Sequence, residues 1–201
     1  MINEVIFDVE TKTFFDEIGS RDPAALGVSI VSVYSRKLDD KLAEISGKME
    51  SFWEDDIEQM WPTFQKADRI VGFNSLGFDV PALKPYASFA LEELPHFDIM
   101  AMVKDVFGKR ISLNAIAQDT LGTKKSDHGA NAIKYYRAGD KNSLAKLKRY
   151  CEDDVIITRD IYDFGLKQGL LKFKDRWNTL REVEIDFSHP KKEETTQDSL
   201  F

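Results

Sequence analysis

Four acidic residues of this chain occupy positions where the surrounding pattern calls for a buried, apolar residue. Asp8 and Glu10 lie in VIFDVETK, Asp79 lies in GFNSLGFDVPAL, and Asp154 lies in YCEDDVIIT. Burying a carboxylate is costly unless a cation compensates its charge. The chain must therefore fold so that these charges are compensated, and four of them together indicate divalent metal ions and chemistry on phosphate.

Residues 4–10 alternate in a way that predicts a strand with two distinct faces. One face carries Val5, Phe7 and Val9, and the other carries Ile6, Asp8 and Glu10. The two acidic side chains therefore share a face, about 6.6 Å apart along the strand. An isolated Asp-x-Glu is more simply a solvated strand end, but the apolar flanks favour a central, buried strand.

The rest of the chain mixes strand and helix patterns. Further strands are expected over 27–35, within 41–53, over 69–73 and within 94–108. Helices are expected over 53–67 with an interruption or end near Pro62, over about 79–83, within 94–108 after the short strand, and throughout the chain beyond Arg110, the last running from about Ser143 to Phe164. Asp98 is expected to begin the helix within 94–108, as its cap or as a group that supports the metal ligands. This order predicts an α/β domain with a mixed sheet. Residues 1–188 are expected to form one domain, and 189–201, which lack periodicity, a flexible tail.

The last long helix has an unusual core-facing stripe. The stripe consists of Leu144, Leu147, Cys151, Val155 and Ile161. Tyr150 and Asp154 fall on it too, four residues and about 6 Å apart along the helix axis. A tyrosine on an apolar face is ordinary, whereas an aspartate is not. Glu152 and Asp153 point away from the stripe and are expected to be solvated.

Asn74 and Asp79 lie between the strand expected over 69–73 and the helix that follows it. A strand-to-helix turn is a place where α/β folds put functional groups. Two simpler interpretations stay open at this point. Asp79 is also a suitable N-cap, and Asn74 is suited to satisfying the backbone groups of a turn.

In this order, the motifs D-x-E, N-x-x-x-F-D and Y-x-x-x-D resemble the three exonuclease motifs of the DEDD superfamily, in its tyrosine branch. The nearest resemblance is to the proofreading exonuclease domain of family B DNA polymerases and its free-standing relatives, and it spans residues 5–160. The histidine branch would need a histidine in place of Arg149, whereas Tyr150 stands where the tyrosine branch requires it.

The resemblance implies a ribonuclease H-like fold, with a mixed five-stranded sheet flanked by helices and the first strand central. It implies that Asp8, Glu10, Asp79 and Asp154 hold two Mg²⁺ or Mn²⁺ ions about 4 Å apart. Tyr150 would orient the attacking water, because a phenol with a pKa near 10 is a poor base at neutral pH. The implied activity is 3′→5′ exonuclease action on single-stranded DNA, with RNA as a second substrate. The alternatives are a ribonuclease H-type endonuclease and a catalytically silent nucleic-acid-binding or clamp-binding module.

Charge and aromatic residues indicate where nucleic acid would bind. The net charge is −7, but the segment 109–149 carries ten basic and three acidic residues, so the remainder carries −14. Such asymmetry is typical of local phosphate binding, the alternative being a solvated helical face. Candidate contacts are Asn74, Lys124 and Lys125, with Phe14 and Phe78 for base stacking. The lysines are otherwise loop residues in solvent, and the phenylalanines otherwise core residues.

The chain ends in QDSLF, where Gln197, Leu200 and Phe201 resemble the pentapeptide by which bacterial replication proteins dock on the sliding clamp. Asp198 departs from the aliphatic residue usual at the second position. The alternatives are chance and docking of the Leu-Phe pair on the protein's own surface.

The cellular compartment is predicted from features that the sequence lacks. No apolar run reaches the roughly 20 residues of a transmembrane helix, and MINEVIFDVE lacks the basic and then apolar order of a signal peptide. Cys151 is the single cysteine, and we expect it to be a small, reduced core residue. A cytoplasmic protein without a membrane partner is expected.

Overall fold

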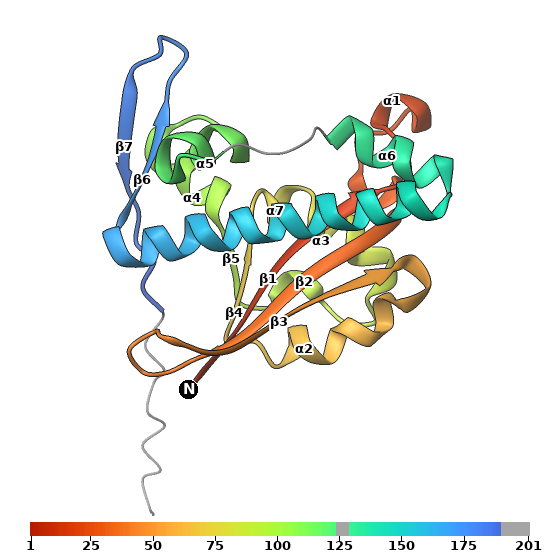
Figure 1. The fold of residues 1–201 in the computed structure, drawn as a ribbon, viewed down its shortest axis with the longest axis horizontal. Helices are drawn as coiled ribbons and strands as arrows, with labels where there is room; N and C mark the ends of the chain where they lie inside the picture. The colour runs from red at the N-terminus through yellow and green to blue at the C-terminus, as the bar shows by residue number, and fades with distance from the viewer. Residues whose placement is uncertain (124–128, 190–201) are drawn as a thin grey trace, which may run out of the picture.

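The computed structural model describes residues 1–123 and 129–189, which form a mixed five-stranded sheet and a separate two-stranded hairpin (Figure 1). The strands of the sheet are β1 (Ile2–Thr11), β2 (Val28–Leu38), β3 (Glu44–Trp53), β4 (Arg69–Gly72) and β5 (His96–Asp98). Their spatial order is β3-β2-β1-β4-β5, so the predicted first strand is central. The expected mixed five-stranded sheet is confirmed.

The two neighbours of β1 pair with it over different lengths. The antiparallel pairing with β2 runs from Ile2 to Thr11, with an irregularity between Glu10 and Thr11. The parallel pairing with β4 covers only Glu4 to Ile6. The second half of β1 therefore extends past the end of β4, and this is the half that carries both predicted acidic residues.

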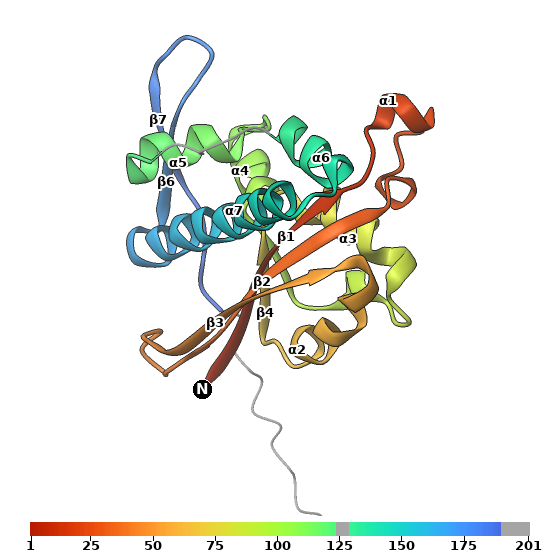
Figure 2. The same ribbon diagram turned by 45° about the vertical axis from the view of Figure 1, so that its right-hand side comes forward.

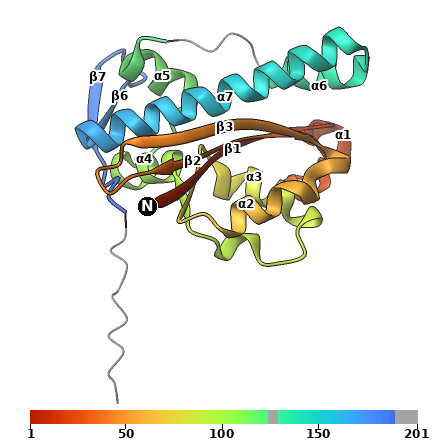
Figure 3. The ribbon, with the colours of Figure 1, turned by 60° about the horizontal axis from the view of Figure 1, so that its bottom comes forward.

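Helices cover both faces of the sheet (Figure 3). The long helix α7 (Lys141–Gln168) crosses one face, while the short helices α2 (Trp61–Gln65) and α3 (Asp79–Leu83) lie against the other. The predicted alternation of β1 is confirmed, because Ile6 belongs to the core on the α7 side. Val5, Phe7 and Val9 belong to the core on the other side.

The remaining helices complete the upper part of the molecule in Figure 1. They are α1 (Phe15–Ile18), α4 (Ile99–Phe107), α5 (Leu113–Leu121) and α6 (Gly129–Ala138). The helix expected over 53–67 is divided: a 3₁₀ segment covers Glu54–Met60, and Pro62 then lies in the first turn of α2. Pro62 therefore begins a helix and does not end one, because the first turn needs no N–H donor at that position.

The expectation that the chain is wholly helical beyond Arg110 is wrong. After α7 ends at Gln168, with Gly169 as its C-cap, β6 (Leu170–Lys174) and β7 (Leu180–Glu184) form an antiparallel hairpin. Leu171 and Phe173 alternate with exposed or half-buried residues and are fully buried. Gly169 and Asn178 have positive φ angles of 68° and 59°, which end the helix and allow the hairpin turn.

Within the described residues, no helix combines the length and apolar character that crossing a membrane requires. Lys124, Lys125, Gln197, Leu200 and Phe201, named above as candidate contacts, lie outside the described residues, as does most of the predicted tail.

Candidate metal centre

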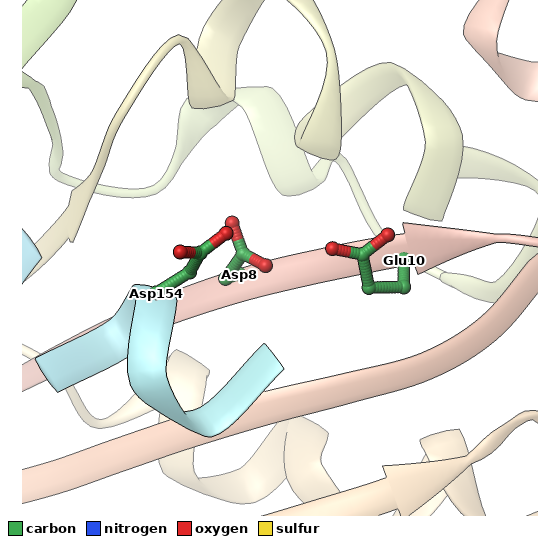
Figure 4. A group of neighbouring side chains, drawn as sticks. All are labelled: Asp8, Glu10 and Asp154. Carbon is green, nitrogen blue, oxygen red and sulfur yellow. The ribbon is translucent and has the colours of Figure 1, made fainter. Parts of the chain in front are cut away.

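Three of the four predicted carboxylates converge between β1 and α7. Oxygen atoms of Asp8, Glu10 and Asp154 all lie within 4.8 Å of one another. Figure 4 shows Asp154, which projects from α7, close to the Asp8 carboxylate, with Glu10 further along β1. Asp8 and Glu10 are half-buried, and Asp154 is only 4% exposed.

The packing of α7 on β1 fixes this convergence. Cys151 is fully buried, and its sulfur lies 3.5 Å from the main-chain oxygen of Asp8 and 3.6 Å from its Oδ2. The predicted core role of Cys151 is confirmed, and burial raises the pKa of its thiol well above the ordinary value. Asp154, one turn beyond Tyr150, thus faces the sheet at the level of Asp8.

Asp79 lies in the same cleft but comes from a different element. It is the first residue of α3, and its Oδ1 accepts a hydrogen bond of 3.0 Å from the backbone N–H of Val9. Since β4 has ended at this level, the carboxylate takes the place of a neighbouring strand. The interpretation of Asp79 as an N-cap is wrong, because the N-cap position is Phe78.

The electrostatics of the cleft favour a bound cation. Burial raises the pKa of Asp79 to about 7, and the charges of Asp98 and Asp154 add to this effect. Burial also raises the pKa of the Tyr150 hydroxyl far above its usual value, with the Asp154, Glu10 and Asp8 carboxylates contributing. A divalent cation would offset this repulsion, and carboxylate oxygens are the ligands that hard cations such as Mg²⁺ and Mn²⁺ prefer. The residues present therefore fit a metal centre.

The carboxylates line an open cleft of about 330 Å³. Its walls include the predicted residues Phe14, Asn74, Phe78 and Tyr150, together with Thr13, Phe15, Phe73 and Ile133. Phe14 and Phe78 are half-buried and lie outside the three core clusters. The sequence reasoning missed Phe15 and Phe73, although each lies directly beside a residue it had named.

Asp98 organises the turn that leads to Asp79. It is the N-cap of α4, as expected, and accepts a hydrogen bond of 3.1 Å from Ala101 N. It also accepts hydrogen bonds from the backbone N–H groups of Asn74, at 2.8 Å, and Leu76, at 3.0 Å. Asn74 adopts a left-handed φ of 62° and its side chain forms no cap. The buried Asp98 therefore positions the turn on which Asn74 and Phe78 reach the cleft.

Three further residues differ in role from the sequence interpretation. Glu152 and Asp153 are half-buried, and Glu152 accepts a hydrogen bond of 2.8 Å from the Ser51 hydroxyl, so the expectation of full solvation is wrong. Arg137, part of the basic segment, pairs with Glu17 at 2.5 Å and so links α6 to α1. This hydrogen bond lowers the pKa of Glu17 to about 2.

Fold and cleft together define a ribonuclease H-like protein with a cluster of acidic residues. A sequence model of the RNase H superfamily matches residues 5–164, and the chain therefore belongs to this superfamily. No curated protein matches the chain in sequence.

Among solved structures, the chain is similar to the family B DNA polymerase from the hyperthermophilic archaeon Pyrobaculum calidifontis, with 23% sequence identity and a TM-score of 0.59. The similarity covers 83% of this chain and 25% of the polymerase chain, so the chain corresponds to about a quarter of that protein's length. At this identity the likeness is one of fold. It agrees with the ribonuclease H-like fold expected from the motifs.

Proposed function

We propose that the protein is a metal-dependent 3′→5′ exonuclease acting on single-stranded nucleic acid, with DNA as the favoured substrate and RNA as the second. The observation that carries this proposal is the convergence of Asp8, Glu10 and Asp154 within 4.8 Å. Asp79 lies in the same cleft, and the superfamily supplies the fold in which such a cluster serves hydrolysis of phosphodiester bonds.

The residues of the cleft have different roles in the proposed reaction. Two Mg²⁺ or Mn²⁺ ions, when bound, would supply a water of lowered pKa and stabilise negative charge on the phosphorus and the leaving 3′-oxygen. Asp8 and Glu10 offer ligand oxygens from a rigid central strand, and Asp154 from the facing helix. Tyr150 keeps its proton because its pKa is raised, so it donates a hydrogen bond that orients the attacking water.

The aromatic wall of the cleft suits a strand end of any sequence. Phe14 and Phe78 line the cleft and present ring surface on which terminal bases stack. Phe15 packs edge-on against Phe78 at 6.1 Å between ring centroids and so holds it in place. Stacking does not discriminate between bases, which agrees with an exonuclease that removes successive nucleotides.

The test is degradation of single-stranded DNA and RNA of one sequence, labelled at the 3′ or the 5′ end, with Mg²⁺, Mn²⁺ or EDTA. A metal-dependent ladder that shortens from the 3′ end is expected, and it should vanish in Asp8→Ala and Asp154→Asn. Asp153→Asn is the matched control, because it removes the neighbouring charge on α7 and should keep activity. Internal cuts would instead indicate an endonuclease.

A catalytically silent binding module remains the competing interpretation. It would leave every strand intact, and Mn²⁺ would not raise the melting temperature. An assembled metal site should give a shift that grows with metal concentration. Intact strands without a metal-induced shift would therefore refute the proposal.

The domain limits and the tail belong to the same proposal. Residues 1–188 would act as the exonuclease domain, and 189–201 as a tether that raises the local concentration at DNA ends through a sliding clamp. The support for the tether is the sequence of Gln197, Leu200 and Phe201 alone. A peptide of residues 192–201 should bind a bacterial clamp, and Leu200→Ala with Phe201→Ala should abolish that binding.

A further inference from the structure

The β6–β7 hairpin presents a large aromatic side chain to solvent at its turn. Trp177 is 65% exposed, whereas Trp61 is buried and Trp53 half-buried. The turn projects from the upper edge of the molecule in Figures 1 and 2, at the opposite end from α1 and α6, which flank the second half of β1. A single exposed apolar residue needs no explanation in itself, so its surroundings decide whether it has a role.

The turn that carries Trp177 is held in one conformation by Asp175. Its Oδ1 accepts hydrogen bonds from the backbone N–H groups of Trp177, at 2.9 Å, and Thr179, at 3.1 Å. Its Oδ2 accepts a third hydrogen bond of 2.8 Å from Arg181 Nε. The indole therefore stands on a pre-organised turn, and a ligand that contacts it does not have to order the loop.

The hairpin is also fixed to the body of the protein. The Thr120 hydroxyl accepts a hydrogen bond of 2.9 Å from Lys172 N and donates one of 2.8 Å to Lys172 O. Asp119 accepts a hydrogen bond of 2.7 Å from Lys174 N. Since Thr120 and Asp119 belong to α5, this helix sets the position of the hairpin, and with it that of Trp177, relative to the body of the protein.

Two cations lie beside the exposed ring. The Arg176 guanidinium lies 4.0 Å from the Trp177 ring centroid, and Lys109 Nζ lies 6.0 Å from it. Lys174 and Arg110 are exposed nearby in sequence. Among residues 1–123 and 129–189, none of these four cations forms an ion pair with a carboxylate. An aromatic face beside unpaired cations matches a nucleobase and its phosphates.

We infer that Trp177 and Arg176 form a stacking contact for an unpaired base of single-stranded nucleic acid, with Lys109 and Lys174 at the adjacent phosphates. Tryptophan and arginine are also common in protein–protein interfaces, but lysine is depleted there, so the two lysines beside this pair favour nucleic acid over a protein partner. The inference rests on the proposed function in one respect: the strand it describes is the substrate whose 3′ end enters the cleft. The hairpin would then hold a part of the strand remote from the bond that is cut.

The test is titration of oligodeoxythymidine and oligouridine into Asp8→Ala protein with EDTA, which keeps the strands intact. Binding should quench Trp177 fluorescence and protect it from acrylamide. Trp177→Ala should weaken binding about tenfold, the loss expected for one stacked base, and Trp177→Phe should restore part of it. Leu180→Ala, which removes an exposed apolar side chain at the start of β7, is the matched control and should bind as the parent does.

The outcomes separate this inference from the proposed function. Two results together would overturn the inference, even if the wild-type protein degrades DNA. The first is an affinity for both strands that is unchanged in Trp177→Ala. The second is acrylamide quenching of Trp177 in the Asp8→Ala parent that the bound strands do not reduce. Weakened binding in Trp177→Ala would support it, even if no strand is ever cut. A difference between the two oligonucleotides shows whether DNA or RNA is held at the hairpin.

Discussion

Asp79→Asn should stabilise the metal-free protein at neutral and alkaline pH. Asparagine has the same shape and keeps an oxygen that accepts the hydrogen bond from Val9 N–H, but it carries no charge. In the wild type, burial and the neighbouring carboxylates raise the pKa of Asp79 from 3.8 to about 7. The substitution thus removes the unfavourable charge while it leaves the contact with β1 in place.

The sign and size of this stability difference follow from the linkage between proton binding and folding. Between 3.8 and about 7 the folded protein holds a proton that the unfolded chain has released, so wild-type stability falls as pH rises through this interval. The difference between the two pKa values corresponds to about 4 kcal/mol. Asp79→Asn lacks this loss of stability. Above neutral pH it should therefore unfold at a temperature about 10 °C higher than the wild type does. Below pH 3.8 the two proteins should be alike.

The measurement is urea or thermal unfolding in EDTA over a series of pH values, repeated with Mn²⁺. Mn²⁺ should stabilise the wild type strongly and Asp79→Asn weakly, because the variant has lost one ligand charge. Asp55→Asn, the same substitution at an exposed position, should change neither the pH dependence of stability nor the stabilisation by Mn²⁺. Equal unfolding of the wild type and Asp79→Asn above neutral pH in EDTA would refute the reasoning.

Three further predictions concern other contacts. Tyr150→Phe should slow single-turnover cleavage far less than Asp154→Ala, because the phenol positions water and the carboxylate holds metal; equal losses would contradict this order. Gly165→Ala should cost about 1–3 kcal/mol in urea unfolding, because a Cβ there would lie within 2.5 Å of the Phe187 ring; unchanged stability would show that the ring moves aside. Although burial alone would raise it, hydrogen bonds from His189 and Arg36 lower the pKa of Glu4 below 4.5. Glu4→Gln should therefore lower the melting temperature at neutral pH, and the deficit should shrink as pH falls below 4.5 and Glu4 protonates in the wild type; a deficit that is constant with pH would count against this account.

The polar network that includes Glu4 anchors the end of the described chain. Arg36 lies 2.7 Å from Glu4 and 2.7 Å from Asp163 of α7. Arg69 donates to the main-chain oxygen of Phe187 at 2.7 Å, and the Tyr162 hydroxyl donates to Glu4 at 2.8 Å. This network lies toward the N-terminal end of β1, away from the acidic cleft, so it holds sheet, helix and C-terminal segment together without entering the site.

The acidic cluster could be predicted because its parts follow local periods. The period of two on a strand places Asp8 and Glu10 on one face, and the helical spacing of four places Tyr150 and Asp154 on one stripe. Both periods hold whatever the rest of the chain does, provided that the segment has the assigned structure. The order of three such motifs then indicated the superfamily and the central position of β1.

The β6–β7 hairpin and the contacts of Asp98 could not be predicted from a local period. The β6–β7 strands are short, and their alternation is hard to distinguish from a helical end without the contact of Leu171 and Phe173 with the core. Gly169 and Asn178 were the local signals that could have indicated the turn points. Asp98 was expected as a cap, but its two bonds to the turn at Asn74 depend on β5 lying beside β4.

The sequence by itself determined which side chains share a face of a strand or helix, because that depends on backbone period alone. It determined the acidic residues of β1 and α7, two of the aromatic residues near them, Phe14 and Phe78, and the class of fold. Only the tertiary structure decided that Asp79 meets Val9, 70 positions away, and that Trp177 stands on a rigid turn among cations. Such contacts depend on how separate elements pack, and no period within one element encodes that packing.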